Sequence, residues 1–198
     1  ADYLVAACEA SLRRLGTDHL DLFQVHRPDV LTHPAEVARA LETLVTSGKV
    51  RAVGVSNYTC PQVAALVAHL RIPLASIQPE FSPLALEALA DGTLDLAMQH
   101  RISVLAWSPL AGGRLGEPGN DAPAQRVCAE LDRQAQRCGV SRAAATYAWI
   151  MAHPAGIIPI VGSQQPSRIR EAAAAYQVEW TRADWYRVLV ASRGVALP

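Results

Sequence analysis

Five short apolar segments alternate along the chain with alanine-rich stretches that have the spacing of helices. Each segment ends in polar or turn-forming residues, and the five are LDLFQVHRPD (20–29), AVGVSN (52–57), ASIQPE (75–80), ISVLAWSP (102–109) and GIIPIVGS (156–163). Alternation of short strands with helices is typical of a parallel α/β sheet or barrel. Continuous apolar runs such as SVLAW and IIPIV also predict strands that are buried on both faces.

The stretches between the apolar segments predict eight helices. They span residues 2–15, 34–47, 61–70, 93–100, 124–137, 141–153, 166–175 and 182–192. Pro34 and Pro61 stand at first-turn positions, and Thr59 or Cys60 would cap the second of these two helices. Glycines are placed to end three helices, at Gly16, Gly48 and Gly139.

The composition is that of a compact soluble enzyme domain. Hydrophobic residues make up 51% of the chain, and 18 basic side chains balance 18 acidic ones. No apolar run is long enough to cross a bilayer and no basic stripe stands out, so we expect neither a membrane nor a nucleic-acid partner. We expect no signal peptide before the first helix, although Ala1 opens in the middle of a helical pattern and need not be the native start.

The cysteines predict no metal site, because their spacing contains no CxxC pair or other metal-type pattern. We interpret all four as reduced thiols of a cytoplasmic protein: Cys8, Cys60, Cys128 and Cys138.

One histidine stands directly after the first apolar segment. A strand that ends by presenting His26 is a candidate floor of an active site, since histidine is the commonest general acid or base. The alternative is a hydrogen-bonded structural histidine. The four further segments of the same kind favour the catalytic interpretation.

Five motifs in order resemble the later part of an aldo-keto reductase, a barrel enzyme that transfers hydride from NADPH to a carbonyl. They are VHRPD, GKVRAVGVSN, IQPEFSP, AWSPLAGGRL and PIVGSQQPSRIREA. The resemblance implies an α/β fold of the (β/α)8 TIM-barrel type, here a partial barrel with about five parallel strands and surrounding helices. It also implies one domain over residues 1–198, truncated at its N-terminus relative to the family, with the active site at the carboxyl ends of the strands.

By the resemblance, three residues at two neighbouring strand ends would hold the carboxamide of the nicotinamide ring. They are Ser56, Asn57 and Gln78, which offer a hydroxyl and two amides. The alternative is that they only satisfy backbone groups at turns, as such residues usually do.

The segment after the fourth strand would hold the rest of the nicotinamide half of the cofactor. Trp107 takes the position of an aromatic that stacks on the nicotinamide, the alternative being ordinary packing. The loop that follows would let backbone N–H groups approach a pyrophosphate, with Arg114 providing charge. Its cofactor-binding candidates are Ser108, Leu110, Gly112 and Arg114, and Gly113 would let backbone N–H groups approach closely in the same way as Ser108 and Gly112.

The last motif indicates which nucleotide is bound. Gly162 and Ser163 lead into a helix whose N-terminus can attract an anion. Arg168 can form a forked contact with the adenosine 2′-phosphate of NADPH, together with Ser163. Gln165 or Glu171 would lie near the adenine. We therefore predict NADPH/NADP+ as the cofactor. Because Gln164 and Ala172 depart from the residues common in relatives, the preference for NADP should be weaker than in the strongest binders, and NAD is not excluded.

His26 takes the catalytic-histidine position of the family, where it orients the substrate carbonyl beside a proton-donating tyrosine. The family supplies this tyrosine from a DTAxxYG motif, with its pKa lowered by a lysine that an aspartate braces. All three precede the equivalent of Ala1. The only lysine here is Lys49, and none of the five tyrosines lies in such a motif: Tyr3, Tyr58, Tyr147, Tyr176 and Tyr186.

A five-stranded remnant would leave the sheet unclosed, with two apolar edges that invite pairing. Three explanations compete. The chain is a fragment of a longer reductase, a second chain completes the barrel, or the remnant folds with a new function. We predict an NADP(H)-dependent oxidoreductase that, in the complete protein, reduces aldehydes or ketones to alcohols. The alternatives are a catalytically inactive NADP(H)-binding or regulatory module, and another barrel enzyme that uses His26 with Asp29 or Glu80. The partner is a small-molecule carbonyl substrate, and the substrate's identity and the oligomeric state stay open.

Overall fold

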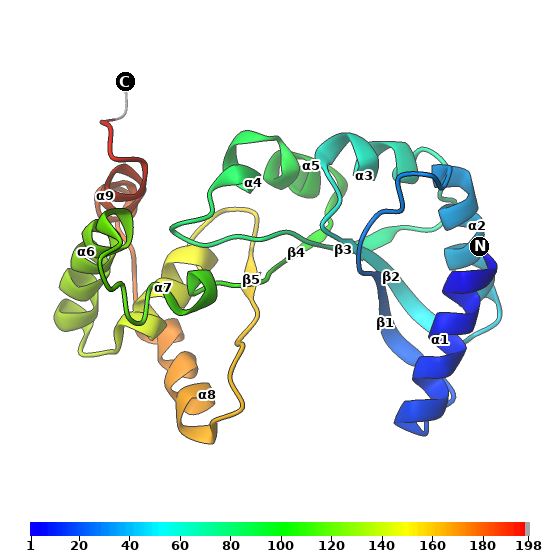
Figure 1. Cartoon of the computed structure of the whole chain (residues 1–198), viewed down its shortest axis with the longest axis horizontal. Coiled ribbons are helices and arrows are strands. Elements are labelled where there is room, and N and C mark those ends of the chain that lie inside the picture. Colours follow the sequence, from blue (N-terminus) through cyan, green and yellow to red (C-terminus); the bar gives the residue numbers. More distant parts are fainter. Residues whose placement is uncertain (197–198) are drawn as a thin grey trace. The chain divides into compact units, whose positions relative to one another are not determined.

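The computed structural model describes residues 1–196 and forms two compact units. Unit 1 comprises residues 1–79 and 91–104, and unit 2 comprises residues 80–90 together with the chain from Leu105 onward. Five strands, all paired in parallel, follow the order β1-β2-β3-β4-β5 (Figure 1). The predicted α/β class with five parallel strands is therefore confirmed, whereas the single domain over residues 1–198 stays a prediction.

Unit 1 is a parallel sheet covered by helices. Its elements are α1 (Asp2–Leu15), β1 (Leu20–Val25), α2 (Pro34–Thr46), β2 (Val50–Ser56), α3 (Cys60–Val67), β3 (Leu74–Gln78), α5 (Thr93–His100) and the first half of β4 (Ser103–Ala106). Helix α2 contacts β2 and lies between α1 and α3 (Figure 1). Its buried stripe of Val37, Leu41 and Leu44 recurs at helical spacing, which places one face of α2 in the core.

Local capping explains where several helices of unit 1 begin and end. The Thr59 hydroxyl accepts a hydrogen bond from the Gln62 N–H, and the Gln62 side chain accepts one from the Thr59 N–H, so Thr59 rather than Cys60 caps α3. The His33 ring nitrogen accepts from the Ala35 N–H and caps α2. Gly16 ends α1 with φ 65°, a left-handed conformation that glycine adopts without strain.

Unit 2 is mainly helical around the second half of β4. Its other elements are α4 (Glu87–Ala90), the 3-10 helix η1 (Ala111–Gly113), α6 (Ala122–Cys138), α7 (Arg142–Met151), β5 (Ile158–Pro159), α8 (Pro166–Ala172), the 3-10 helix η2 (Ala173–Gln177) and α9 (Arg182–Arg193). Helix α6 packs against α9 and α7, and α7 also contacts β5 and α8 (Figure 1).

Two tryptophans join α7 to α9 through a reciprocal contact. Trp149 Nε1 donates to the carbonyl of Trp185 at 3.1 Å, and Trp185 Nε1 donates to the carbonyl of Trp149 at 2.9 Å. The rings of Trp149 and Trp185 stack with centroids 4.5 Å apart. The ring of Phe81 also stacks on Trp149, with centroids 5.9 Å apart. Trp149 is fully buried. Both indole N–H groups of this aromatic pair therefore have hydrogen-bond partners.

Several predicted boundaries are wrong, most clearly at the last strand. β5 has two residues instead of the predicted eight, and Ile158 and Ile160 are 53% and 37% exposed rather than buried on both faces. Among the described strands β5 pairs only with β4, and Pro159 has no N–H to extend the ladder. The predicted helix 166–175 ends at Ala172 and continues as η2, and α4 and η1 were not predicted.

No helix within residues 1–196 is both long enough and apolar enough to span a membrane.

Replacing Trp149 with phenylalanine should cost about 2 kcal/mol of stability. The change removes one part-buried hydrogen bond, leaves the Trp185 carbonyl without that donor, and reduces ring contact. Urea unfolding followed by circular dichroism would measure the loss.

Trp180→Phe is the matched control. Its Nε1 is buried without a hydrogen-bond partner among the described residues, so the same chemical change breaks no bond and should cost under ~1 kcal/mol. Equal losses for the two variants would show that the reciprocal bonds contribute nothing.

Candidate active site

The carboxyl ends of β1, β2 and β3 bring three predicted site segments to one edge of the sheet in unit 1. Val25 pairs with Val55 and Ser56 with Gln78 in the parallel register. His26 follows β1 directly, Ser56 ends β2, and Gln78 ends β3. The predicted gathering of these residues at the strand ends is thus observed within unit 1.

Hydrogen bonds connect these strand ends. Asn57 Nδ2 donates to the backbone carbonyl of His26 and to Ser56 Oγ, both at 3.0 Å. The Gln78 carbonyl accepts from the Asn57 N–H at 3.1 Å and from Ser56 Oγ at 3.0 Å. Asn57 adopts φ 58°, which asparagine tolerates better than most residues. Ser56 and Asn57 therefore do bind backbone carbonyls, as expected if these residues only satisfy backbone groups at turns. The His26 side chain is exposed.

A chain of side-chain hydrogen bonds lies beside these strand ends. Gln78 Nε2 donates to Gln24 Oε1 at 2.9 Å, and Gln24 Nε2 donates to Ser76 Oγ at 3.1 Å. Gln24 thereby orients the Gln78 amide, whose Oε1 has no hydrogen-bond partner among residues 1–196. The result is an acceptor held at a defined place next to Asn57.

Sequence reasoning missed Gln24, although a pattern could have found it. Ser76 and Gln78 are two residues apart and share one face of β3, and Gln24 is a polar residue in an otherwise apolar strand end. Polar side chains inside a sheet need partners. Gly54 makes room for this network, because a Cβ there would lie 2.1 Å from Ser76 Oγ and 2.9 Å from the Ser76 carbonyl oxygen.

The loop after β4, in unit 2, is more closed than expected. Trp107 is half-buried, and its carbonyl accepts from the Phe81 N–H. Ser108 Oγ accepts from the Gly112 N–H at 3.0 Å, and the N–H groups of Gly113 and Arg114 donate to Leu110 and Ala111. In this structure the N–H groups of Gly112, Gly113 and Arg114 are therefore used by the 3-10 turn η1 itself, and contact between this loop and a pyrophosphate stays a prediction.

Two more candidates in this loop have structural partners. The Leu110 side chain packs against the buried cluster around Tyr147 and Ala175. The Arg114 guanidinium forms an ion pair with Asp121, whose other oxygen caps α6 by accepting from the Ala124 N–H. These two hydrogen bonds, the cap first, lower the pKa of Asp121. Asp121 thus partly compensates the positive charge of Arg114 that was predicted to attract a pyrophosphate.

The remaining candidates follow β5. Because β5 pairs with β4 in parallel, the loop after β5 and the loop after β4 leave the same edge of the sheet. Gly162 is exposed, and Ser163 Oγ accepts from the Gln165 N–H at 3.2 Å. Arg168 and Glu171 are exposed on α8, and Arg168 forms no ion pair among the described residues. Helix α8 has only seven residues, so its dipole adds less attraction for an anion than the prediction assumed.

Two tyrosines among the described residues, Tyr58 and Tyr147, have shifted pKa values, and neither is suited to donating a proton. Burial first, and then the charge of Asp29, raises the pKa of Tyr58. Burial and then Glu171 raise the pKa of Tyr147. Both shifts go in the wrong direction for a general acid at neutral pH. Lys49 Nζ is paired with Glu9 Oε1 at 2.5 Å, and no group of His, Cys, Asp and Glu within residues 1–196 could hold a metal ion.

Comparison with known proteins identifies the family. The model of the aldo/keto reductase family matches residues 1–190. The chain belongs to this family. It is 56% identical over 198 residues, the whole chain, to the 6-dehydroglucose reductase of Novosphingobium aromaticivorans, and 39% identical over 196 residues, 98% of the chain, to the 6-dehydroglucose reductase of Agrobacterium fabrum.

A solved structure confirms the fold. The chain superposes on a thermostable aldo-keto reductase in complex with the inhibitor epalrestat with a TM-score of 0.87 and 23% identity, covering 96% of this chain and 66% of the other. The chain spans just under two thirds of the two reductases named above, 65% and 64% of their lengths. The family match begins at residue 1, so it gives no support to the prediction that the N-terminal segment of the family is absent.

Gly54→Ala should destabilise the chain by about 1–3 kcal/mol, because the new Cβ overlaps Ser76 and forces apart the Gln24–Ser76–Gln78 network. Urea unfolding would measure the change. Gly162→Ala is the control, since a Cβ there meets no atom within 4 Å; a loss as large in this variant would contradict the steric explanation.

Proposed function

We propose that this chain binds NADP(H) and, in a protein that also carries a proton-donating tyrosine and lysine, reduces an aldehyde or ketone to an alcohol. The 198 residues contain no DTAxxYG motif and a single lysine, so the reaction is assigned to the whole protein. The supporting observation is the hydrogen-bonded group of His26, Asn57 and Gln78 at three neighbouring strand ends.

Each residue group would have a separate task. Asn57 and Gln78 would hold the carboxamide of the nicotinamide ring, with Ser56 fixing the Asn57 amide and Gln24 fixing the Gln78 amide. The bound cofactor supplies the hydride. His26, exposed beside Asn57, would donate a hydrogen bond to the substrate carbonyl and orient it.

The candidates of unit 2 would bind the remainder of the cofactor. Trp107 would cover one face of the ring, and the loop that follows, with Ser108, Leu110, Gly112 and Arg114, would contact the pyrophosphate. Arg168 and Ser163, with Gly162, would take the adenosine 2′-phosphate, and Gln165 or Glu171 the adenine. Arg168 is suited to this role because it is exposed and unpaired among the described residues.

For the substrate we propose an aldehyde at carbon 6 of a hexose. The support is the name of two relatives, the 6-dehydroglucose reductases of Novosphingobium aromaticivorans and Agrobacterium fabrum, to which the chain is 56% and 39% identical. We also propose a cytoplasmic location, which fractionation of cells would test.

Titration of the chain with NADPH and NADH, followed by tryptophan fluorescence, tests cofactor binding. We expect saturable quenching that favours NADPH and that is reduced in Trp107→Phe, the variant that lacks the stacking indole. In the whole protein, NADPH consumption with 6-dehydroglucose should fall about 100-fold in His26→Ala with unchanged NADPH affinity. A large loss of NADPH affinity in that variant would make His26 a structural residue.

A binding module without catalysis is the second candidate. It is favoured by the raised pKa of Tyr58 and Tyr147 and by the pairing of Lys49 with Glu9. NADPH binding without turnover in the whole protein would support it.

Arg168→Ala should weaken NADPH binding about 10- to 100-fold and leave NADH binding nearly unchanged, because only NADPH carries the 2′-phosphate. Fluorescence titration with both nucleotides measures the ratio, and Arg170→Ala, an exposed arginine on the same helix, is the control. Equal losses for the two nucleotides would remove Arg168 from this role.

A further inference from the structure

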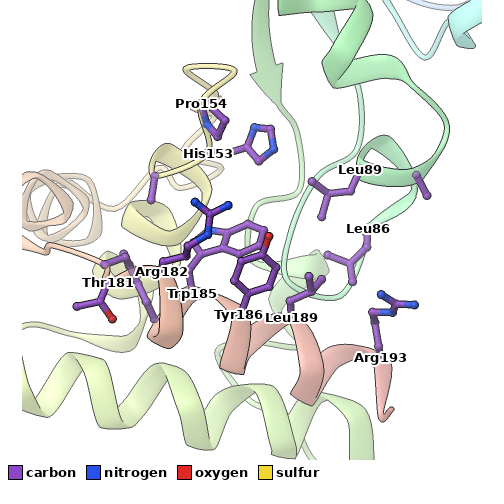
Figure 2. A pocket seen from close by; sticks show the side chains of 13 residues that line it. Leu86, Leu89, His153, Pro154, Thr181, Arg182, Trp185, Tyr186, Leu189 and Arg193 are labelled. Carbon is purple, nitrogen blue, oxygen red and sulfur yellow. The ribbon is translucent and has the colours of Figure 1, made fainter. Parts of the chain in front are cut away.

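Unit 2 contains a cleft of about 730 Å³ that the proposed function does not use. Helix α9 forms one wall, and Leu86 and Leu89 of the α4 segment and His153 and Pro154 after α7 lie around it (Figure 2). The volume falls within the ~300–1,000 Å³ typical of small-molecule sites. None of the lining residues is among the candidates for cofactor binding.

The face of α9 that lines the cleft is apolar in the middle and charged at the ends. Arg182, Trp185, Tyr186, Leu189 and Arg193 recur at helical spacing and share this face (Figure 2). The arginines are eleven residues apart, about 16 Å along the axis at ~1.5 Å per residue. A ligand that fits this face has an apolar body.

The charge of the cleft is uncompensated. The lining contains two arginines and no aspartate or glutamate. On the same helix Arg187 is paired with Asp184, which also binds Arg137. Arg182 and Arg193 form no ion pair with any described residue. Charge complementarity therefore favours an anion.

Of the two arginines, Arg182 is the better anchor. It is the first residue of α9, where the positive end of the helix dipole reinforces attraction for an anion, whereas Arg193 ends the helix at the negative end. Its guanidinium lies 5.9 Å from the centroid of the Tyr186 ring, which holds it over the cleft. A single guanidinium matches a carboxylate in forked geometry.

We propose that this cleft is a ligand site for an organic carboxylate with an apolar body of one or two rings. The carboxylate binds Arg182, and the body lies between Trp185 and Leu189 on α9 and the leucines of the α4 segment. The Trp149–Trp185 hydrogen bonds fix this wall before the ligand binds. The site is independent of the proposed reductase chemistry.

Isothermal titration of the 198-residue chain with sodium 2-naphthoate and with its neutral analogue, 2-naphthamide, tests the site. We expect one naphthoate per chain and binding of the amide at least ~10-fold weaker. Arg182→Gln should lower naphthoate affinity about 10-fold and leave amide affinity unchanged. Leu89→Asp, which places a negative charge in the cleft, should abolish naphthoate binding.

Matched variants decide whether the assignment holds. Arg193→Gln, at the other end of the same face, and Arg170→Gln, outside the cleft, should each change naphthoate affinity less than ~3-fold. Circular dichroism checks that every variant is folded. No saturable binding at millimolar naphthoate, equal binding of the amide, or losses in Arg170→Gln as large as in Arg182→Gln would overturn the proposal. A loss in His26→Ala would place the carboxylate at the strand ends instead and overturn it equally.

Discussion

Parallel pairing of β1, β2 and β3 is the constraint on which the candidate active site depends. Parallel strands end at the same edge, so residues far apart in the sequence, His26, Asn57 and Gln78, become hydrogen-bonded neighbours. The acceptors of the contacts that connect them are backbone carbonyls, and the donor to the His26 carbonyl is the Asn57 side chain. A change of the His26 or Gln78 side chain therefore leaves these contacts in place, whereas a shift in strand register would separate all three residues.

The polar network behind this edge shows how packing and function are linked. Gln24, Gly54 and Ser76 are register neighbours across three strands, and the missing Cβ of Gly54 lets the Ser76 hydroxyl approach its partner. Amide side chains inside a sheet are costly unless bonded. Because Gln24 and Ser76 satisfy each other and Gln24 also binds Gln78, the position of the Gln78 amide is defined by the sheet itself.

The sequence predicted helices better than strands, although a side-chain cap was not what made a span accurate, since α1 and α5 have none and α3, which has a capping box, ends three residues earlier than predicted. The predicted spans of α1 and α5 agree with the observed ones at both ends, and Thr59, Pro34 and Gly16 act as expected. Apolar runs were less informative. The run IIPIV predicts a strand that is buried on both faces, yet β5, the strand that it forms, pairs with β4 alone among the described strands and contains Pro159. The site residues came from motif order. The alternation of polar residues hinted at Gln24, but its partners lie on another strand, and the Arg114–Asp121 pair follows from the fold of one loop, so neither set of contacts could be read from residue spacing.

The reciprocal bonds between Trp149 and Trp185 limit how α9 can move. Each indole donates to the carbonyl of the other residue, so a slide of α9 by one residue, or a rotation about its axis, breaks both bonds together. The helix is therefore pinned in translation and in rotation by a single pair of side chains. The face that carries Arg182 and Leu189 is consequently kept in one orientation, and thermal motion of α9 should take the form of bending at its ends rather than turning in place.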